Sequence, residues 1–249
     1  MRNWEDLPTE LQLNEVRPYY DILKKKQISL AFKRIFDIAV SLLLLIILSP
    51  VFLILAIAIK IDSEGPVFYR QTRITQYCKE FKIHKFRSMC NGADKRGTLV
   101  TVNGDSRVTR VGKFIRKCRL DEVSQLIDVL QGNMSFVGTR PEVPKYVSEY
   151  TSEMMATLLL PAGITNEACI NFKDEADLID GIEDADRVYI EEILPKKMQW
   201  NLLGIKEYGF WKEILIMFRT FFVVLGIVKP KEFTAECLKL EKQVLMKNK

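Results

Sequence analysis

The sequence contains a single histidine, His84, and no pair of cysteines at the spacing of a zinc site. One histidine argues against a histidine metal cluster and against a Ser-His-Asp triad. We expect His84 to pack or to hydrogen-bond rather than to catalyse. The cysteines are scattered and odd in number, which argues against a disulfide framework and fits a reducing compartment. They are Cys78, Cys90, Cys118, Cys169 and Cys237.

The chain also lacks internal repeats and low-complexity linkers, and its charge is spread unevenly. Of its 249 residues, 48% are apolar and 28% charged, which excludes a disordered tail and a multi-span transporter. The net charge is +5, but residues 1–120 hold 22 Lys/Arg against 11 Asp/Glu, and residues 121–249 hold 15 against 21. The basic half predicts an anionic partner: phosphates, nucleic acid or an acidic membrane surface.

The longest stretch without a charge is residues 38–59. At ~1.5 Å per residue, a helix of this length could cross a ~30 Å hydrocarbon core. A cleaved signal peptide is the weaker interpretation, because the stretch follows 37 largely polar residues. Pro50 cannot donate to the carbonyl of Ile46, so we expect the helix to kink or break there, with the Ser49 hydroxyl bonding a freed carbonyl.

The break leaves two interpretations open. A sharp bend would let the segment enter and leave the membrane by one face, and Lys/Arg residues flank it on both sides. A spanning helix normally shows a one-sided excess of these residues. An ordinary proline-kinked span is equally compatible with the sequence, because membrane helices tolerate proline.

The rest of the chain predicts an α-rich α+β fold. Alternating apolar and polar residues predict strands within 62–75 and 79–89, followed by a turn-rich stretch at 91–106. Residues 1–30 predict a short amphipathic helix. Further helices are expected at 107–119, 120–132 (ending at Gly132), 146–160 and 174–199. Residues 209–228 predict an amphipathic helix, which either lies in a membrane interface or is buried in the core.

A basic helix followed by two carboxylates suggests a site for chemistry on phosphates. The helix at 107–119 carries six basic side chains and no acid, and it ends directly before Asp121 and Glu122; Arg140 follows among turn residues. Arginines hold phosphate oxygens, one carboxylate can bind Mg²⁺, and the other can attack phosphorus. Adjacent residues on an α-helix point about 100° apart, so the two carboxylates could divide these roles. Two alternatives remain: acids at a helix start suit the macrodipole, and the basic run could be a membrane or nucleic-acid surface.

From Lys33 to about Ala168 the chain resembles the bacterial sugar transferases, the monotopic phosphoglycosyl transferases. The segments that carry the resemblance are KRIFDIAVSLLLLIILSPVFLILAIAIK, GPVFYRQTRI, KIHKFRSM, TRVGKFIRKCRLDEVSQLIDVLQGNMSFVGTRPEV and LPAGIT. The resemblance implies transfer of a phosphosugar from a nucleotide diphosphosugar, usually a UDP-sugar, to polyprenyl (undecaprenyl) phosphate, with release of UMP. This reaction is the first membrane step of a capsule, exopolysaccharide, O-antigen or glycoprotein pathway.

The resemblance also implies roles for single residues. The membrane segment becomes a re-entrant helix broken at Ser49 and Pro50. Asp121 becomes the nucleophile, which forms an aspartyl-phosphosugar intermediate, and Glu122 helps to hold Mg²⁺. The implied phosphate-binding positions are Arg116, Arg140 and Pro141, and Lys85 and Arg87 are further candidates for phosphate or structural contacts. The chain departs from the family pattern at Thr75, Thr139, Ala162 and Asn166, which bears on substrate contacts more than on catalysis.

The implied organisation is a polar extension (1–30), a re-entrant membrane helix (31–60), a catalytic core (61–170) and a C-terminal helical region (171–249). We expect a monotopic protein of the bacterial inner membrane, with its soluble part on the cytoplasmic face. Expected partners include anionic lipids and a possible second copy of the chain, but no nucleic acid. A non-enzymatic membrane adaptor is the alternative; it predicts no dependence on Asp121. A membrane-anchored nucleic-acid binder is a third hypothesis, and the sequence holds no known motif for it.

Overall fold

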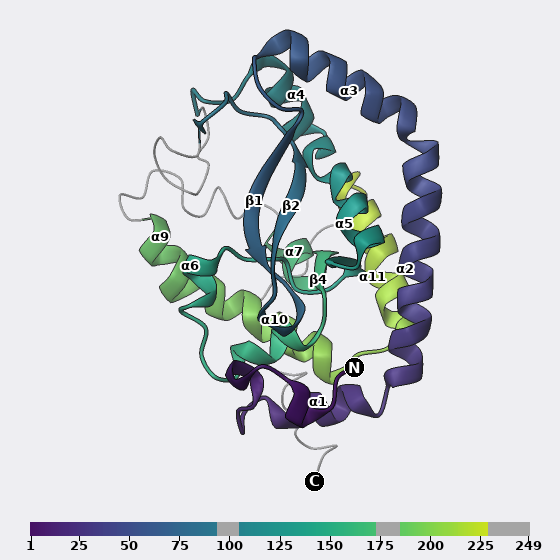
Figure 1. Cartoon of the computed structure of the whole chain (residues 1–249), viewed down its shortest axis with the longest axis vertical. Coiled ribbons are helices and arrows are strands. Elements are labelled where there is room, and N and C mark those ends of the chain that lie inside the picture. Colours follow the sequence, from purple (N-terminus) through teal and green to yellow (C-terminus); the bar gives the residue numbers. More distant parts are fainter. Residues whose placement is uncertain (94–104, 173–184, 229–249) are drawn as a thin grey trace.

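Helices form most of the ordered elements, and two small sheets lie among them (Figure 1). The computed structural model describes residues 1–93, 105–172 and 185–228. The helices are α1 (Arg17–Lys24), α2 (Gln27–Ile47), α3 (Ser49–Asp62), α4 (Arg110–Lys117), α5 (Leu126–Gln131), α6 (Pro144–Val147), α7 (Glu167–Asn171), α9 (Ala185–Val188), α10 (Leu194–Lys206) and α11 (Phe210–Val224). The strands are β1 (Phe68–Ile74), β2 (Glu80–Phe86), β3 (Met134–Val137) and β4 (Ala162–Thr165). The predicted α-rich α+β class is confirmed.

The long apolar segment forms two helices, α2 and α3, which are bent by 61° at Leu48. The Ser49 hydroxyl donates to the carbonyl of Ile46 at 2.8 Å, the carbonyl that Pro50 cannot bond. The predicted break and the role of its serine are confirmed. In the described part of the chain no helix alone is long and apolar enough to cross a bilayer. By length and composition, α2 and α3 taken together meet this requirement.

Large apolar side chains point outward along α2, α3 and α11. They include Phe32, Ile35, Leu43 and Ile46 on α2, Leu53, Ile54 and Ile57 on α3, and Trp211, Leu215, Phe218 and Phe221 on α11. Contiguous exposed patches of this kind mark membrane or protein contacts. Only Val223 of α11 is buried, so the alternative of a core helix at 209–228 is wrong.

The first 26 residues pack into the core instead of forming a separate arm. Leu11 and Leu23 are fully buried, in one cluster with Leu159 and with Ile205, of which only Ile205 belongs to α10. The predicted amphipathic helix is α1, which follows two short 3-10 turns. Because α2 begins at Gln27, it runs across the expected boundary at residue 30.

The predicted strands pair as an antiparallel hairpin, β1 with β2, in a register from Phe68 opposite Phe86 to Ile74 opposite Glu80. The parallel pair of β3 and β4 was not expected from the sequence. Gly163 of β4 also touches the backbone just after β3: a Cβ on Gly163 would lie 2.1 Å from the nitrogen of Gly138. The Gly163 amide donates to the Thr139 carbonyl at 2.8 Å, which fixes the loop that leads to Arg140.

Two helix predictions need correction. Residues 120–132 form a 3-10 helix (Leu120–Gln125) and then α5, not one α-helix. Arg119, with a left-handed backbone (φ +56°), separates them from α4. Gly132 ends α5 as predicted. Residues 146–160 are split between α6 and a 3-10 helix (Met154–Leu159). Here the Ser148 hydroxyl bonds the Lys145 carbonyl, a side-chain contact that competes with helix continuation.

Parts of two further predictions lie outside the described residues: 94–104 of the turn-rich stretch and 173–184 of the acidic helix. Cys237 lies outside them too. From residue 185 the chain is helical, with a π-helical turn at Tyr189–Ile193 between α9 and α10.

Candidate active site

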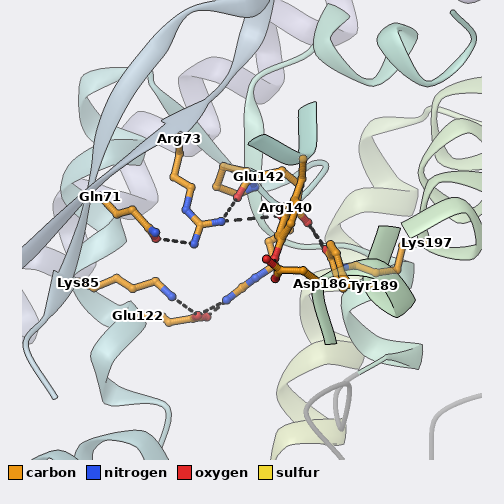
Figure 2. Close-up of polar contacts among 11 residues, drawn as sticks. Gln71, Arg73, Lys85, Glu122, Arg140, Glu142, Asp186, Tyr189 and Lys197 are labelled. Carbon is orange, nitrogen blue, oxygen red and sulfur yellow. Dashed lines mark hydrogen bonds and ion pairs between the residues drawn. The ribbon is translucent and has the colours of Figure 1, made fainter. Parts of the chain in front are cut away.

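Three charged side chains from different elements meet in a partly buried cluster (Figure 2). Lys85 comes from β2, Glu122 from the 3-10 helix Leu120–Gln125, and Arg140 from the loop after β3. The Lys85 ammonium lies 3.1 Å from Oε1 of Glu122. Arg140 donates from Nη1 to Oε2 of Glu122 at 3.2 Å and from Nη2 to Oε1. These side chains are only 16–33% exposed, so the ion pairs are less screened than pairs on an open surface.

A buried histidine positions Lys85. The His84 backbone amide donates to Oδ2 of Asp128 at 2.8 Å, and the ring nitrogen Nδ1 of His84 lies 2.7 Å from Oδ1 of the same carboxylate. Arg70 lies 2.6 Å from Nε2 of His84; because a guanidinium can only donate, Nδ1 carries the proton. The Ser124 hydroxyl donates to the His84 carbonyl, so β2 is tied to the 3-10 helix that carries Glu122. The prediction that His84 is a hydrogen-bonding residue is confirmed.

Asp121 lies beside this cluster. Consecutive residues of a 3-10 helix point about 120° apart, not the 100° expected for an α-helix, so the two carboxylates still diverge. Burial raises the pKa of Asp121, and so does the charge of Glu122, while Lys85 and Arg116 oppose the shift. The Asp121 carboxylate is therefore less stabilised as an anion than the Glu122 carboxylate, which suits a group that acts as a nucleophile.

Glu122 behaves in the opposite sense. Burial disfavours its ionised form, but the charges and hydrogen bonds of Arg140 and Lys85 outweigh burial and hold its pKa well below its ordinary value. Burial lowers the pKa of Lys85, and Glu122 opposes this. The pair of carboxylates therefore combines one strongly stabilised anion with one weakly stabilised anion.

A second network lies behind Arg140 and was missed from the sequence (Figure 2). Arg73 of β1 donates to the Pro141 carbonyl at 2.9 Å, and its Nη1 lies 3.8 Å from Glu142. Glu142 accepts from the Tyr189 hydroxyl at 2.6 Å, and Lys197 lies 3.5 Å from it. One signal was available: Lys197 falls on the apolar stripe of α10, where a lysine must have a partner.

The structure brings most of the predicted site residues together. Lys85, Glu122 and Arg140 are in contact, Asp121 adjoins them, and Arg116 of α4 acts on Asp121 through its charge. Pro141 contributes its carbonyl to the Arg73 contact.

Two other predictions lie apart from this cluster. Arg87 donates to the backbone carbonyls of Ile59, Ser63 and Glu64. These contacts hold the end of α3, so they are structural. Ser49 and Pro50 lie at the break between α2 and α3.

Sequence comparison then decides the family. The family model described as bacterial sugar transferase matches residues 28–226. The chain belongs to this family. It is 37% identical over 199 residues to a UDP-glucose:undecaprenyl-phosphate glucose-1-phosphate transferase of Klebsiella pneumoniae, an alignment that covers 78% of this chain and 40% of the relative.

Two more sugar transferases match closely. A UDP-N-acetylgalactosamine-undecaprenyl-phosphate N-acetylgalactosaminephosphotransferase of Aeromonas hydrophila is 36% identical, with 78% of this chain and 43% of the relative covered. A UDP-glucose:undecaprenyl-phosphate glucose-1-phosphate transferase of Escherichia coli (strain K12) is 37% identical, with 83% and 43% covered. The chain thus spans about two fifths of the length of these curated relatives.

The departures from the sugar transferase pattern support the backbone around Arg140. The Thr75 hydroxyl donates to the Asn133 carbonyl at 2.6 Å and accepts from the Ala162 amide at 3.0 Å, so two departures contact each other. The Asn166 amide donates to the Gly138 carbonyl at 2.8 Å. These side chains hold β3 and β4 together.

The donor set suits magnesium when substrate supplies the remaining ligands. Among the described residues no three His, Cys, Asp or Glu side chains are grouped to hold a metal ion. Mg²⁺ commonly binds through one or two carboxylates together with substrate phosphates and water. Glu122 provides one such carboxylate, and a cation there would offset the Glu122 charge that, after burial, raises the pKa of Asp121.

Proposed function

We propose that this sugar transferase moves a sugar 1-phosphate from a nucleotide diphosphosugar, a UDP-sugar, to undecaprenyl phosphate and releases UMP. The observation that carries the proposal is the meeting of Lys85, Glu122 and Arg140 beside Asp121. The names of the relatives, which specify undecaprenyl-phosphate sugar phosphotransferases, support the same reaction. The product would start a bacterial glycan on its lipid carrier.

The proposed reaction has two steps. The Asp121 carboxylate attacks the β-phosphorus, the bond from that phosphorus to the bridging oxygen breaks, and UMP leaves with the bond's electron pair. An oxygen of undecaprenyl phosphate then attacks the phosphorus of the aspartyl-phosphosugar and restores the carboxylate. Arg140, Lys85 and Arg116 stabilise the negative charge on the transferring group in both steps.

The residues have separate tasks in this scheme. The raised pKa of Asp121 makes it the better nucleophile of the pair, and the lowered pKa of Glu122 keeps that carboxylate ionised, as a metal ligand must be. Mg²⁺ held by Glu122 would offset charge on the diphosphate. Arg140 contacts Glu122 and lies in the loop braced by Arg73, so it is held rigidly where the diphosphate must bind.

The proposed location is the bacterial inner membrane, with α2 and α3 as a re-entrant pair and the soluble part on the cytoplasmic face. The 61° bend and the exposed apolar faces of α2, α3 and α11 support this location. α4, with Arg110, Lys113, Arg116 and Lys117, would collect anionic lipids and the phosphates of both substrates at the interface.

The test is UMP release by the protein in nanodiscs with Mg²⁺, a panel of UDP-sugars and undecaprenyl phosphate. We expect release with at least one sugar, dependent on the lipid, on Mg²⁺ and on Asp121. Asp121→Asn removes the nucleophile, and Asp21→Asn, an exposed carboxyl on α1, is the matched control. Asp121→Asn that turns over as fast as the wild type would refute the assigned nucleophile and favour the adaptor hypothesis.

A further inference from the structure

A groove of about 740 Å³ opens where α2 and α11 begin. Lys25 and Lys26 lie at one end of it, and its walls are apolar, with Phe32, Ile35, Phe210 and Trp211 among them. This volume is in the range of small-ligand pockets. We propose that the groove binds one anionic glycerophospholipid, with the phosphate on the two lysines and the acyl chains along the apolar walls. The proposal rests on the membrane position given under the proposed function.

The cationic end can accept a phosphate. The Lys25 side chain is exposed, and its ammonium has no hydrogen-bond or ion-pair partner among the described residues. The Lys26 ammonium donates to the Tyr208 carbonyl, which anchors it at the groove and leaves further donors for a ligand. Both lysines line the groove, one fixed and one without a partner, and they give it a cationic end beside an apolar surface.

The apolar walls continue from this anion site in one direction. Ile28, Phe32 and Ile35 recur at helical spacing on α2 directly after the lysines, and each is more than 60% exposed. The next charged residues of α2 turn away from this stripe: Lys33 is buried against Glu213, and Arg34 bonds the carbonyls of Val129 and Leu130. A ligand that follows the stripe must be anionic at one end and apolar along its length.

α11 closes the other side of the groove. The rings of Phe36 and Phe210 pack edge to face with centroids 5.8 Å apart, and Trp211 is 77% exposed beside them. An exposed tryptophan next to lysines is typical of the membrane interface, where headgroups meet hydrocarbon. This continuity with the membrane-facing surface favours a bilayer lipid over a water-soluble phosphate.

The position also argues against the acceptor substrate. In Figure 1 the start of α2 lies at the opposite end of that helix from α4, the element that leads into Asp121. The acceptor's phosphate must reach the sugar phosphate on Asp121, so a phosphate on Lys25 would lie away from the reaction. The groove therefore takes a resident lipid of the membrane.

The experiment measures which lipid stays with the protein. Full-length protein in nanodiscs of phosphatidylglycerol and phosphatidylcholine is transferred to detergent, and native mass spectrometry counts the lipids that remain bound. We expect one phosphatidylglycerol on the wild type, and about tenfold lower retention for Lys25→Glu. Trp211→Ala should also lower retention, because it removes part of a wall. Both side chains are exposed, so both variants should fold.

Lys60→Glu is the matched control, because it is an exposed lysine beside the other end of the apolar segment and outside the groove. Equal loss in Lys60→Glu, or full retention in Lys25→Glu, would overturn the proposal. Displacement of phosphatidylglycerol by equimolar undecaprenyl phosphate would overturn it as well and identify an acceptor site.

UMP release is measured on the same preparations. Normal release without phosphatidylglycerol selectivity refutes only the lipid site, and selectivity without release refutes only the proposed function.

Discussion

Glu122 and Arg140 form a two-point ion pair, in which each carboxylate oxygen faces a different guanidinium nitrogen. The two residues come from a 3-10 helix and from the loop after β3, so the pair joins elements that follow different paths through the fold. Lys85 completes it from β2 at 3.1 Å. The pair explains how a short loop can hold an arginine rigidly beside Asp121.

Arg140→Lys should retain the charge and lose the two-point geometry, because an ammonium is a point donor. We expect kcat/KM for UMP release to fall about 100-fold, as for other losses of a charge-stabilising donor. Arg87→Lys is the comparison, since Arg87 bonds only backbone carbonyls near α3 in the described structure. A loss as small in Arg140→Lys as in Arg87→Lys would contradict the importance of this geometry.

The charges around Asp121 should set the acid limb of the pH-rate profile. The reaction needs the carboxylate form, so activity falls as pH falls through the pKa of Asp121, which lies above its ordinary value. Lys85→Met removes a charge that lowers this pKa, so the limb should move to higher pH. Glu122→Gln removes a charge that raises it, so the limb of the residual activity should move to lower pH. Shifts of both variants in the same direction would contradict the electrostatic assignment.

Lys197→Met should destabilise the fold, because it leaves Glu142 buried with fewer positive partners. Removing one partner of a buried ion pair costs about 3–5 kcal/mol, and we expect a loss of that order in the free energy of unfolding. Lys196→Met is the matched control, since that neighbouring lysine is exposed on α10. Equal stability of the two variants in denaturant titrations would show that the network behind Arg140 is dispensable.

Glu213 should make stability depend on pH. Burial raises its pKa to about 7, although Lys33 lies 2.8 Å away and opposes the shift; the charge of Asp37, 3.8 Å from Lys33, adds to it. Between pH 4.5 and 7 the folded chain binds this proton and the unfolded chain does not, so the free energy of unfolding falls as pH rises. Glu213→Gln should remove up to about 3 kcal/mol of that fall. Parallel stability profiles of variant and wild type between these pH values would contradict the shift.

The sequence predicted the elements whose signal is local. Proline chemistry placed the break beside Ser49 and Pro50, and alternation located both strands of the β1–β2 hairpin. The carboxylate pair and Arg140 were found by composition and by resemblance, and the structure brings Glu122 and Arg140 into contact.

The features that were missed depend on contacts between distant segments. β3 and β4 have four residues each and are almost wholly buried, so they show no alternation that could separate a strand from a helix. The network of Glu142 and Lys197 joins residues 55 positions apart, and no pattern in one sequence pairs them. The 3-10 helix that carries Asp121 begins after the left-handed backbone of Arg119, a residue whose type does not predict that conformation.

The most direct measurement is the mass of the protein after brief incubation with its UDP-sugar donor and Mg²⁺, without undecaprenyl phosphate, followed by an acid quench. The wild type should gain the mass of one phosphosugar, located by peptic digestion at low pH on the peptide that contains Asp121. Added undecaprenyl phosphate should remove it, and Asp121→Asn should never gain it. An enzyme that turns over without this mass gain, or that carries the phosphosugar on another residue, would contradict the mechanism.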